Sequence, residues 1–383
     1  MKKKVFYWSP SIGKVATNYA VINSAHSIRM YSKEYQSYLI DACGEWGDYL
    51  QEIELKKIKL IKFGFKYFNY LPKYGFVKSR ISYILIFIFS SLNLYKTLKL
   101  YKPKFLISHL ITSLPLILFY FFNFDSKLIL RISGFPKLNI LRKMLWKITG
   151  KNIYKVTCPT IETLNWLKKL QIFEEKQLIL LRDPIINLNR INKLSKNYNL
   201  DQRVLGKNYF LSIGRLTKQK NHELLIDFAN YILKKEDNLN FFIIGSGDNE
   251  EYLKAKIKKF NIQDRVILLG YKKNVIKYLK KAKYLISTSL WEDPGWAMIE
   301  SAACNTIVIS SNCPSGPKEF IGIDRGFLFE NNNLNDLIKK YYQLKNLDEN
   351  KKQLIKINAK KESIKYTLFH HYKTLENEFL RLN

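Results

Sequence analysis

The sequence has few cysteines, and their spacing excludes several kinds of site. Among its 383 residues are four cysteines, Cys43, Cys158, Cys304 and Cys313, and no two of them form a CxxC pair. This spacing matches no zinc-binding pattern, and four thiols in a chain of this length do not make a disulfide framework. The cysteines are therefore predicted to be buried thiols in a reducing compartment.

Acidic residues are scarce relative to basic ones. The chain has 32 Asp and Glu against 64 Lys and Arg, a formal net charge of +32. Residues 51–150 alone hold 18 basic and 3 acidic residues. In the stretches 56–80 and 137–151, cations stand beside aromatic or aliphatic side chains, which favours an anionic membrane surface as partner.

Two other interpretations of this charge stay open. The composition is rich in Lys, Ile, Asn, Phe and Tyr throughout, so part of the charge could be solvated and without function. Nucleic acid is the other partner for a basic surface. The sequence has no zinc-finger spacing, no RNP aromatic pattern and no helix-turn-helix pattern, and we expect no nucleic-acid partner.

One segment resembles a membrane span in composition. Residues 105–124 contain no Asp, Glu, Lys or Arg and are long enough to cross a bilayer. His109 and Pro115 interrupt the run, however. A short buried strand over 105–109 explains it better, followed by a helix with Ser113 as N-cap and Pro115 in its first turn.

Neither of the other apolar runs predicts a span or a signal peptide. The run 83–90 is too short to cross a bilayer. The N-terminal run stops at Pro10, which is too early for a signal peptide. We expect a cytoplasmic protein that associates peripherally with the inner face of the cytoplasmic membrane.

Short apolar strands alternate with helices, a pattern typical of parallel sheets. In the second half we expect strands at 209–213, 240–244, 266–269, 284–288 and 306–309, and helices at 222–235, 250–260, 275–282 and 295–304. In the first half we expect strands at 4–8, 105–109, 128–132 and 155–158. The chain is too long for one ordinary core, and a polar joint covers 183–206. The predicted fold class is α/β, with two doubly wound domains.

In such sheets ligands bind at the carboxyl ends of the strands, so the chemistry belongs in the loops that follow them. After strand 209–213 the sequence reads GRLTKQK. Arg215 and Lys220 there precede a helix, a setting that favours a diphosphate. After strand 240–244, the glycines of Gly245-Ser246-Gly247 permit either a close ligand approach or a tight turn, and both interpretations stay open.

The loop after strand 284–288 is the most informative. It contains Glu292, followed by Asp293, Pro294 and Gly295, and Glu300 comes eight residues after Glu292. Proline and glycine mark the change from loop to helix, so Glu292 is expected in the loop and Glu300 on the helix. The two carboxylates could bind sugar hydroxyls while the helix N-terminus faces an anion. The alternative is that both are solvated.

Together these segments resemble a known family. The pair Glu292-x7-Glu300, preceded by residues 214–220 and followed by 315–319, resembles the donor domain of family 4 glycosyltransferases, retaining enzymes of the GT-B fold. The resemblance covers roughly residues 207–330. It implies two Rossmann-like domains facing a cleft: residues 1–188 with a crossover helix at 364–383 bind the acceptor, and 189–363 bind the nucleotide-sugar donor.

The resemblance also implies roles for single residues. Arg215 and Lys220 would bind the diphosphate and, with Glu292 at the transferred sugar, form the catalytic set. Glu300 would hold the ribose, and the backbone at 270–271 would meet the base. The implied donor-binding residues are Gly13, Gly214, Arg215, Lys220, Gly247, Tyr271, Glu292, Gly295, Trp296 and Glu300.

The acceptor side departs from the family pattern. Many relatives carry His-Gly after the strand that corresponds to 128–132, whereas this chain has Ser133 and Gly134, with Arg131 nearby. The implied acceptor-side residues are Lys14, His109, Arg131 and Ser133.

No Asp-x-Asp pair occurs in the sequence, so we expect no metal and no cofactor. Arg215 and Lys220 would stabilise the leaving diphosphate in its place. The predicted function is retaining transfer of a hexosyl or N-acetylhexosaminyl group from a nucleotide-sugar, with UDP favoured by residues 315–317. The acceptor would be a glycan or polyprenyl-linked glycan in cell-surface polysaccharide or lipopolysaccharide synthesis.

Two other functions stay open. One is a basic nucleic-acid-binding protein of doubly wound fold. The other is a different nucleotide-sugar enzyme such as an epimerase, although residues 9–14 lack the GxGxxG that this would require.

Overall fold

The computed structural model describes residues 2–13, 16–64, 70–72, 76–135, 138–195 and 199–380. The chain forms two compact units. Unit 1 comprises Met1–Pro184 with Leu368–Asn383, and unit 2 comprises Ile185–Thr367. The sequence predicted that the first domain ends at residue 188 and that the chain returns to it at residue 364.

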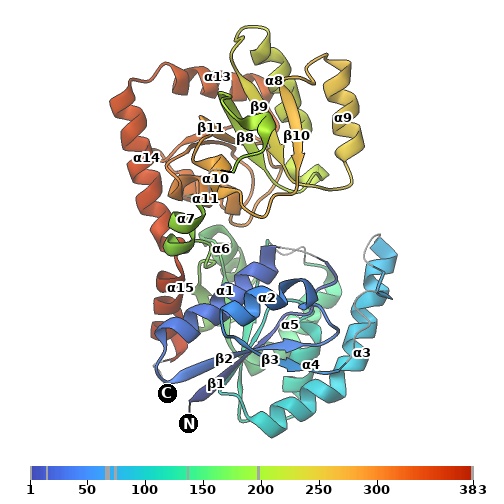
Figure 1. The fold of residues 1–383 in the computed structure, drawn as a ribbon. Helices are drawn as coiled ribbons and strands as arrows, with labels where there is room; N and C mark the ends of the chain where they lie inside the picture. The colour runs from blue at the N-terminus through green and yellow to red at the C-terminus, as the bar shows by residue number, and fades with distance from the viewer. Residues whose placement is uncertain are drawn as a thin grey trace. The chain divides into compact units, whose positions relative to one another are not determined.

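Unit 1 is built on a seven-stranded parallel sheet in the order β3-β2-β1-β4-β5-β6-β7. Figure 1 labels its strands β1, β2 and β3. Its strands are β1 (Lys3–Trp8), β2 (Tyr35–Asp41), β3 (Lys59–Lys62), β4 (Phe105–Ser108), β5 (Lys127–Arg131), β6 (Ile153–Cys158) and β7 (Leu178–Leu180). Before the chain enters unit 2, the helices of unit 1 are α1 (Ala16–Tyr31), α2 (Leu50–Leu55), α3 (Phe76–Tyr101), α4 (Ser113–Phe121), α5 (Ile140–Thr149) and α6 (Ile161–Lys169). The strand order changes direction between β1 and β4, which is where such sheets bind ligands.

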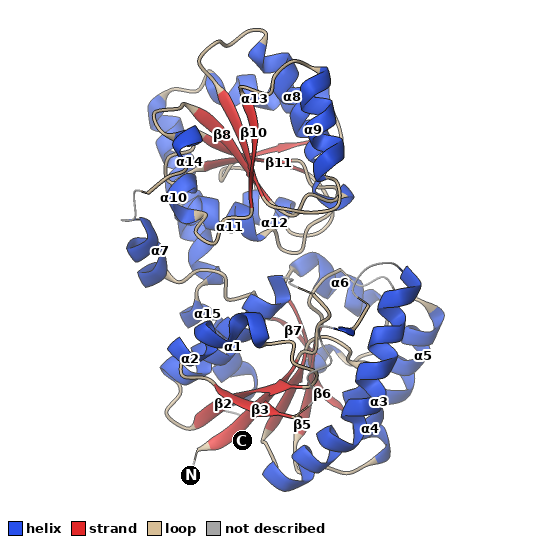
Figure 2. Ribbon diagram, turned by 45° about the vertical axis from the view of Figure 1, so that its right-hand side comes forward, coloured by secondary structure: helices blue, strands red, loops and turns tan. Residues whose placement is uncertain are grey.

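Unit 2 has a six-stranded parallel sheet in the order β10-β9-β8-β11-β12-β13 (Figure 2). Its strands are β8 (Tyr209–Ile213), β9 (Asn240–Ile244), β10 (Val266–Gly270), β11 (Tyr284–Ser287), β12 (Ile307–Ser311) and β13 (Phe327–Phe329). Its helices are α7 (Leu188–Ser195), α8 (His222–Leu233), α9 (Glu250–Lys259), α10 (Ile276–Leu279), α11 (Trp296–Ala303), α12 (Pro317–Ile321), α13 (Leu334–Lys345) and α14 (Glu349–Ser363). The switch point lies between β8 and β11.

The central strands of unit 2 are buried on both faces. Leu211 and Phe242 belong to the core on one side of the sheet, and their neighbours Phe210 and Phe241 belong to the core on the other. Side chains alternate between the faces of a strand, so a strand covered by helices on both sides is apolar at every position. This explains the continuous apolar runs in the sequence.

The end of the chain returns to unit 1. Helix α15 (Leu368–Leu375) packs against α1, as Figure 1 shows with α15 in dark red beside α1 in blue. Tyr372, Leu375 and Phe379 lie in the same core as Val5 and Ile107 of the central strands. The C-terminal segment is thus part of the core of unit 1.

The segment 105–124 forms β4 and α4, which confirms the predicted strand and helix. The predicted cap is wrong. Thr112 is the N-cap residue and makes no side-chain capping bond, and Ser113 is the first helical residue. Pro115 lies in the first turn, where its missing N–H has no helical partner to lose.

The apolar run 83–90 is part of a much longer helix than its length indicated. Helix α3 has 26 residues, and its segment Arg80–Tyr101 is long and apolar enough to cross a membrane by length and composition. About a third of the most apolar window of this segment is buried inside the protein. A single helix of this kind is weak evidence for a membrane span, because the core helix of a soluble protein passes the same test.

All four cysteines are free and buried, which confirms the predicted burial, and the reducing compartment stays a prediction. Cys43 and Cys158 lie in unit 1, and Cys304 and Cys313 lie in unit 2. Burial raises the pKa of the Cys304 thiol to about 12 and that of Cys313 to about 11.

Candidate functional site

Two loops meet at the switch point of unit 2, one following β8 and the other following β11. The N–H of Leu290 donates to the carbonyl of Gln219 at 2.8 Å, and the side-chain amide of Gln219 donates to the carbonyl of Trp291 at 2.9 Å. The hydroxyl of Thr288 donates to the carbonyl of Asn221 at 2.8 Å. These bonds fix the two loops against each other.

Lys220 and Glu292, both predicted site residues, form an ion pair across these loops. The Nζ of Lys220 contacts the Oε1 of Glu292, and the side chains are 18% and 10% exposed. Ser289 donates its hydroxyl to the same carboxylate oxygen at 2.6 Å. The structure therefore brings together a cation and a carboxylate that lie 72 residues apart in the chain.

Gly214 leaves room for the side chain of Lys220. A Cβ at position 214 would lie 3.0 Å from Cγ and Cδ of Lys220, so the lysine stem occupies the space above the glycine. The neighbouring Arg215 is exposed, and its Nη2 donates to the amide oxygen of Gln219 at 3.3 Å. Both predicted cations thus lie at the carboxyl edge of the sheet, and one of them points into solvent.

The glycines after β9 are explained by backbone packing. A Cβ at Gly245 would lie 1.8 Å from the carbonyl oxygen of Gly214, and a Cβ at Gly247 would lie 2.4 Å from that of Leu216. Any side chain at either position would push the loop after β9 away from the loop after β8. This backbone packing explains both glycines. It does not decide between a close ligand approach and a tight turn, and contact of Gly247 with the donor stays a prediction.

The loop after β12 supports Glu292 from the other side. The N–H of Glu292 donates to the carbonyl of Pro314 at 2.8 Å, and the N–H of Ser315 donates to the carbonyl of Glu292 at 3.3 Å. A Cβ at Gly316 would lie 2.4 Å from the carbonyl oxygen of Pro294, so only glycine fits there. The residues that carry the family resemblance at 315–317 thus shape the backbone around Glu292.

Glu300 is the fifth residue of α11, in the second turn after the loop that carries Glu292. Gly295, the N-cap of this helix, has a φ of 97°, and Trp296 is its first residue. Burial raises the pKa of Glu300 to about 7, while the charge of Arg190 on α7 lowers it. Glu292 lies in the loop and Glu300 lies on the helix, as predicted. The sequence did not indicate that the cation Arg190 lies near Glu300.

The loop after β10 presents the remaining predicted donor residue. Gly270 has a φ of 71° and open space where a side chain would be. Tyr271 is 66% exposed. The carbonyl of Gly270 accepts the N–H of Gly245 at 3.1 Å, which ties this loop to the one after β9.

The predicted residues of unit 1 also lie at the carboxyl edge of their sheet. Gly13 follows β1, His109 follows β4, and Ser133 follows β5. The Ser133 hydroxyl lies 3.4 Å from Nδ1 of His109. His109 is buried, and burial together with the charge of Arg131 holds its pKa well below the usual value. Lys14 lies outside the described residues.

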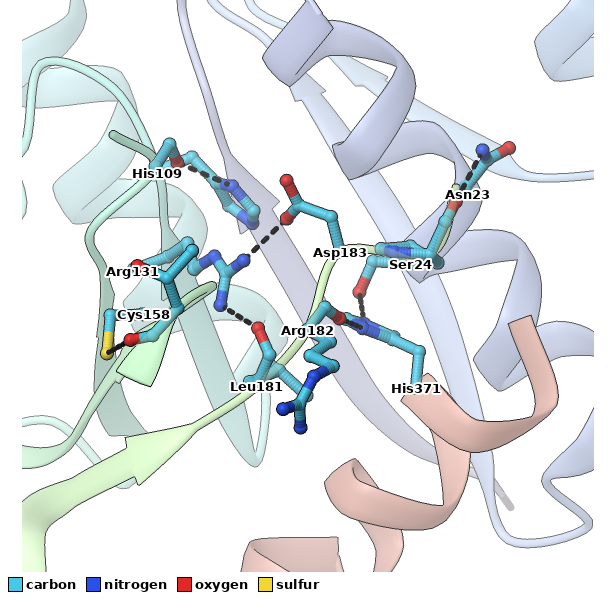
Figure 3. A network of polar contacts seen from close by, with 12 residues as sticks. Asn23, Ser24, His109, Arg131, Cys158, Leu181, Arg182, Asp183 and His371 are labelled. Carbon is cyan, nitrogen blue, oxygen red and sulfur yellow. Dashed lines mark hydrogen bonds and ion pairs between the residues drawn. The ribbon is translucent and has the colours of Figure 1, made fainter. Parts of the chain in front are cut away.

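The guanidinium of Arg131 is hydrogen-bonded inside unit 1. Its guanidinium donates to the carbonyl of Leu181 at 2.6 Å and to the carboxylate of Asp183 at 2.5 Å (Figure 3). Its side chain is 2% exposed. The guanidinium therefore joins the end of β5 to the last residues before the chain enters unit 2, and contact of Arg131 with an acceptor stays a prediction.

His371 of α15 completes this buried network (Figure 3). Its Nδ1 lies 2.7 Å from the carbonyl of Arg182, and its Nε2 lies 2.7 Å from the hydroxyl of Ser24. Burial lowers the pKa of His371 to about 3, so the ring is neutral at physiological pH. Nδ1 therefore carries the proton, and Nε2 accepts from Ser24. These bonds hold the C-terminal helix against α1 and the end of unit 1.

Within the described part of the chain, no group of three or more His, Cys, Asp and Glu side chains is arranged to hold a metal ion.

Two site residues were missed in the sequence, Ser289 and Gln219. Both lie in loops that were already expected to hold the chemistry. Ser289 lies two residues after β11 and donates to Glu292, and Gln219 joins the two loops. The signal that could have found Ser289 is its position, two residues beyond the strand end.

The sequence matches the family model described as glycosyl transferases group 1 over residues 196–362. The matched part of the chain contains the loops that meet at the switch point of unit 2.

Curated relatives carry glycosyltransferase names. The uncharacterized glycosyltransferase MJ1059 of Methanocaldococcus jannaschii is 29% identical over 77% of this chain and 73% of its own length. The poly(ribitol-phosphate) alpha-N-acetylglucosaminyltransferase of Staphylococcus aureus is 30% identical over 49% of this chain and 39% of its own. An N-acetylgalactosaminyltransferase of Campylobacter jejuni that acts on a diphospho-undecaprenol substrate, by its name, is 37% identical over 37% and 38%. The chain thus matches less than half the length of the last two.

Solved structures share the fold over the whole chain. A glycosyltransferase from Rickettsia africae superposes with a TM-score of 0.76 at 16% identity, covering 100% of this chain and 99% of its own. Anabaena HepE in complex with UDP superposes with a TM-score of 0.72 at 13% identity, covering 100% of both chains. The chain has the GT-B fold of these structures. The family-model match and the named relatives support a glycosyltransferase over the two other functions that the sequence left open.

Proposed function

We propose that the chain transfers a sugar, with retention of anomeric configuration, from a nucleoside diphosphate donor held by unit 2. The observation that carries this proposal is the contact of Lys220 with Glu292 at the switch point between β8 and β11, with Arg215 in the same loop as Lys220. Two cations there would stabilise the charge that develops on the leaving diphosphate. Glu292 would contact the sugar, and Glu300 would hold the ribose.

UDP is the proposed donor nucleotide. The structure of Anabaena HepE with UDP has the same fold, and the name of the Staphylococcus aureus relative identifies it as an N-acetylglucosaminyltransferase. A hexosyl or N-acetylhexosaminyl group is accordingly the proposed group transferred. No side chain of the described site is placed as an obvious nucleophile, so the acceptor hydroxyl would attack from the face that the diphosphate leaves.

The proposed acceptor is a glycan, either free or linked to a polyprenyl lipid, in the synthesis of cell-surface polysaccharide. The Campylobacter jejuni relative supports this choice, because its name specifies a diphospho-undecaprenol acceptor. We also propose that transfer needs no metal ion, since Arg215 and Lys220 supply the positive charge and the sequence has no Asp-x-Asp pair.

A thermal-shift series tests the donor assignment. A ligand that binds only the folded protein raises its melting temperature. UDP and UDP-sugars should raise it more than GDP, ADP and their sugars at equal concentration. A larger shift with GDP or ADP would show that the donor carries guanine or adenine instead of uracil. No shift with any of the nucleotides would contradict the proposed donor site.

We further propose that the protein works in the cytoplasm, bound peripherally to the membrane through one face of unit 1. Figures 1 and 2 show α3, α4 and α5 gathered on one side of the sheet of this unit. On α3, buried side chains recur from Ser82 to Leu98, which fixes one side of the helix to the core. The opposite side is apolar and exposed at Ile81, Ile84, Ile88 and Leu92.

Cations adjoin this apolar stripe. Lys96 and Lys99 continue the same face of α3 at positions four and seven after Leu92, and both are exposed. Helix α5 repeats the arrangement with exposed apolar residues beside exposed cations, namely Leu141, Met144 and Ile148 beside Arg142, Lys143 and Lys147. Apolar side chains flanked by cations suit the headgroup region of an anionic leaflet, where each cation contributes about 1 kcal/mol.

Vesicle binding tests this proposal. Wild type should bind vesicles of phosphatidylcholine with phosphatidylglycerol more tightly than vesicles of phosphatidylcholine alone, and salt should weaken binding. The double variant Ile84→Ser/Ile88→Ser should bind about tenfold more weakly, because it removes apolar area that enters the leaflet. Ile323→Ser, a fully exposed isoleucine of unit 2, is the matched control. Equal binding to both kinds of vesicle, or an unchanged double variant, would contradict the proposal.

A further inference from the structure

The ammonium of Lys220 is paired with a carboxylate. Its described side-chain contact is the carboxylate of Glu292, which also accepts the hydroxyl of Ser289. The two charged side chains are largely buried, so solvent screens their attraction less than it would at the surface. The cation assigned to the diphosphate is thus neutralised by the carboxylate assigned to the sugar.

The backbone holds both partners in place. The hydroxyl of Thr288 donates to the carbonyl of Lys220 at 3.1 Å, and the lysine stem lies over Gly214. Glu292 is fixed through its own backbone by Pro314 and Ser315. The pair can therefore separate by rotation of the two side chains, without movement of either loop.

A diphosphate bound to the Lys220 ammonium would lie next to the Glu292 carboxylate. Two like charges at contact distance repel each other, and the repulsion is stronger at a largely buried site than in water. The diphosphate and Glu292 therefore compete for the same ammonium.

We infer that the Lys220–Glu292 pair is a stand-in contact that the donor diphosphate displaces, so that phosphate binding releases the Glu292 carboxylate to the sugar. This inference rests on the proposed function and adds an order of events to it. Before the donor arrives, Glu292 holds the lysine in place of a phosphate. After the donor arrives, Lys220 turns to the diphosphate, and Glu292 becomes free to accept a sugar hydroxyl.

The displacement has a consequence that separates it from a simple binding role. If Glu292 competes with the diphosphate, its removal favours the bare nucleotide. Glu292→Gln keeps the size of the side chain and loses its charge. It should bind UDP about fivefold more tightly than wild type, which corresponds to about 1 kcal/mol of lost competition. A residue that only supports the loop would weaken binding when changed.

Titration calorimetry with UDP on wild type, Glu292→Gln, Lys220→Ala and the double variant tests the inference. In the Lys220→Ala background, Glu292→Gln should change UDP affinity by less than about twofold, because the two residues act as a pair. Glu251→Gln, an exposed carboxylate on α9, controls for a general change of charge and should leave UDP affinity unchanged. A crystal structure with UDP should place Lys220 Nζ and Glu292 Oε1 beyond the ~4 Å range of an ion pair.

The outcomes distinguish the inference from the proposed function. Absence of nucleotide binding by wild type overturns both. Binding of UDP by wild type with equal or weaker binding by Glu292→Gln overturns the inference alone. An unbroken Lys220–Glu292 contact in a UDP complex overturns it as well.

Discussion

The α-carbon of Gly316 lies against the carbonyl oxygen of Pro294, so closely that a Cβ would come within 2.4 Å of it. The loop after β12 is thereby fitted to the loop that carries Glu292. Gly316 also has a φ of 111°, a conformation that other residues rarely adopt.

We predict that Gly316→Ala moves the Glu292 loop and lowers kcat/KM about tenfold or more, since small displacements of positioning groups are costly to catalysis. Steady-state kinetics with the full donor measures this. Gly47→Ala is the control, because a Cβ at position 47 meets no atom within 4 Å. Wild-type kinetics in Gly316→Ala would show that the contact does not position Glu292.

Arg215 and Lys220 should both be needed for transfer. Replacing either by Ala should lower turnover about 10²-fold, the scale for loss of one preorganised charge contact at a developing anion. Lys218→Ala is the matched control, an exposed lysine in the same loop. Turnover within about twofold of wild type for both variants would remove the diphosphate assignment.

Transfer should continue in excess EDTA, because the proposed charge stabilisation comes from side chains. The measurement is the initial rate before and after dialysis against the chelator. Loss of activity that manganese or magnesium restores would contradict the metal-free mechanism.

Glu300 should make donor binding depend on pH. Burial raises its pKa to about 7, so in the free protein the carboxyl loses its proton as the pH rises through this value. The charged form accepts stronger hydrogen bonds from ribose hydroxyls. Affinity for a UDP-sugar should therefore increase between pH 6 and pH 8 in wild type, and Glu300→Gln should remove this increase. A parallel pH dependence in the variant would assign the titration to another group.

The Glu300 carboxyl makes folding stability fall with rising pH, whereas it makes donor affinity rise. The folded-state pKa of Glu300 lies above its ordinary value of 4.5, so the folded protein binds this proton more tightly than the unfolded chain does. The resulting stabilisation is complete below about pH 4.5 and is lost as the pH rises to about 7. Without donor, Glu300→Gln should gain stability relative to wild type over this range, as measured by thermal unfolding.

Arg131 and Asp183 should contribute to stability rather than to donor binding. Arg131→Met leaves the buried carboxylate of Asp183 without its cation, which costs about 3–5 kcal/mol in comparable buried pairs. Urea unfolding should show this loss. Arg131→Met/Asp183→Leu should recover part of it, and UDP affinity should stay at the wild-type value in every variant that folds.

The sequence predicted unit 2 better than unit 1, for a physical reason. Strands such as β9 are buried at every position and appear as continuous apolar runs. β2 alternates between buried and partly exposed residues and contains Gln36 and Ser37, and β7 and β13 have only three residues each, so none of these gave a clear signal. Helix α3 is apolar on its exposed side as well as its buried side, which hides the helical period.

The positions of the site loops were also predictable, because ligands bind where parallel strands end. The contact between Lys220 and Glu292 was not. It depends on the order of strands in the sheet, which places β8 beside β11 although 70 residues lie between Ile213 at the end of β8 and Tyr284 at the start of β11. Ser289 and the glycine contacts around Glu292 depend on the same tertiary arrangement.

The cysteines give each unit its own chemical reporter of unfolding. Two buried thiols lie in unit 1 and two in unit 2, and alkylating reagents need both access and a thiolate. Native protein should therefore label slowly, and each thiol should react only when its surroundings open. Mass spectrometry of labelled peptides would then measure the opening of the two units separately in one sample, with no engineered probe.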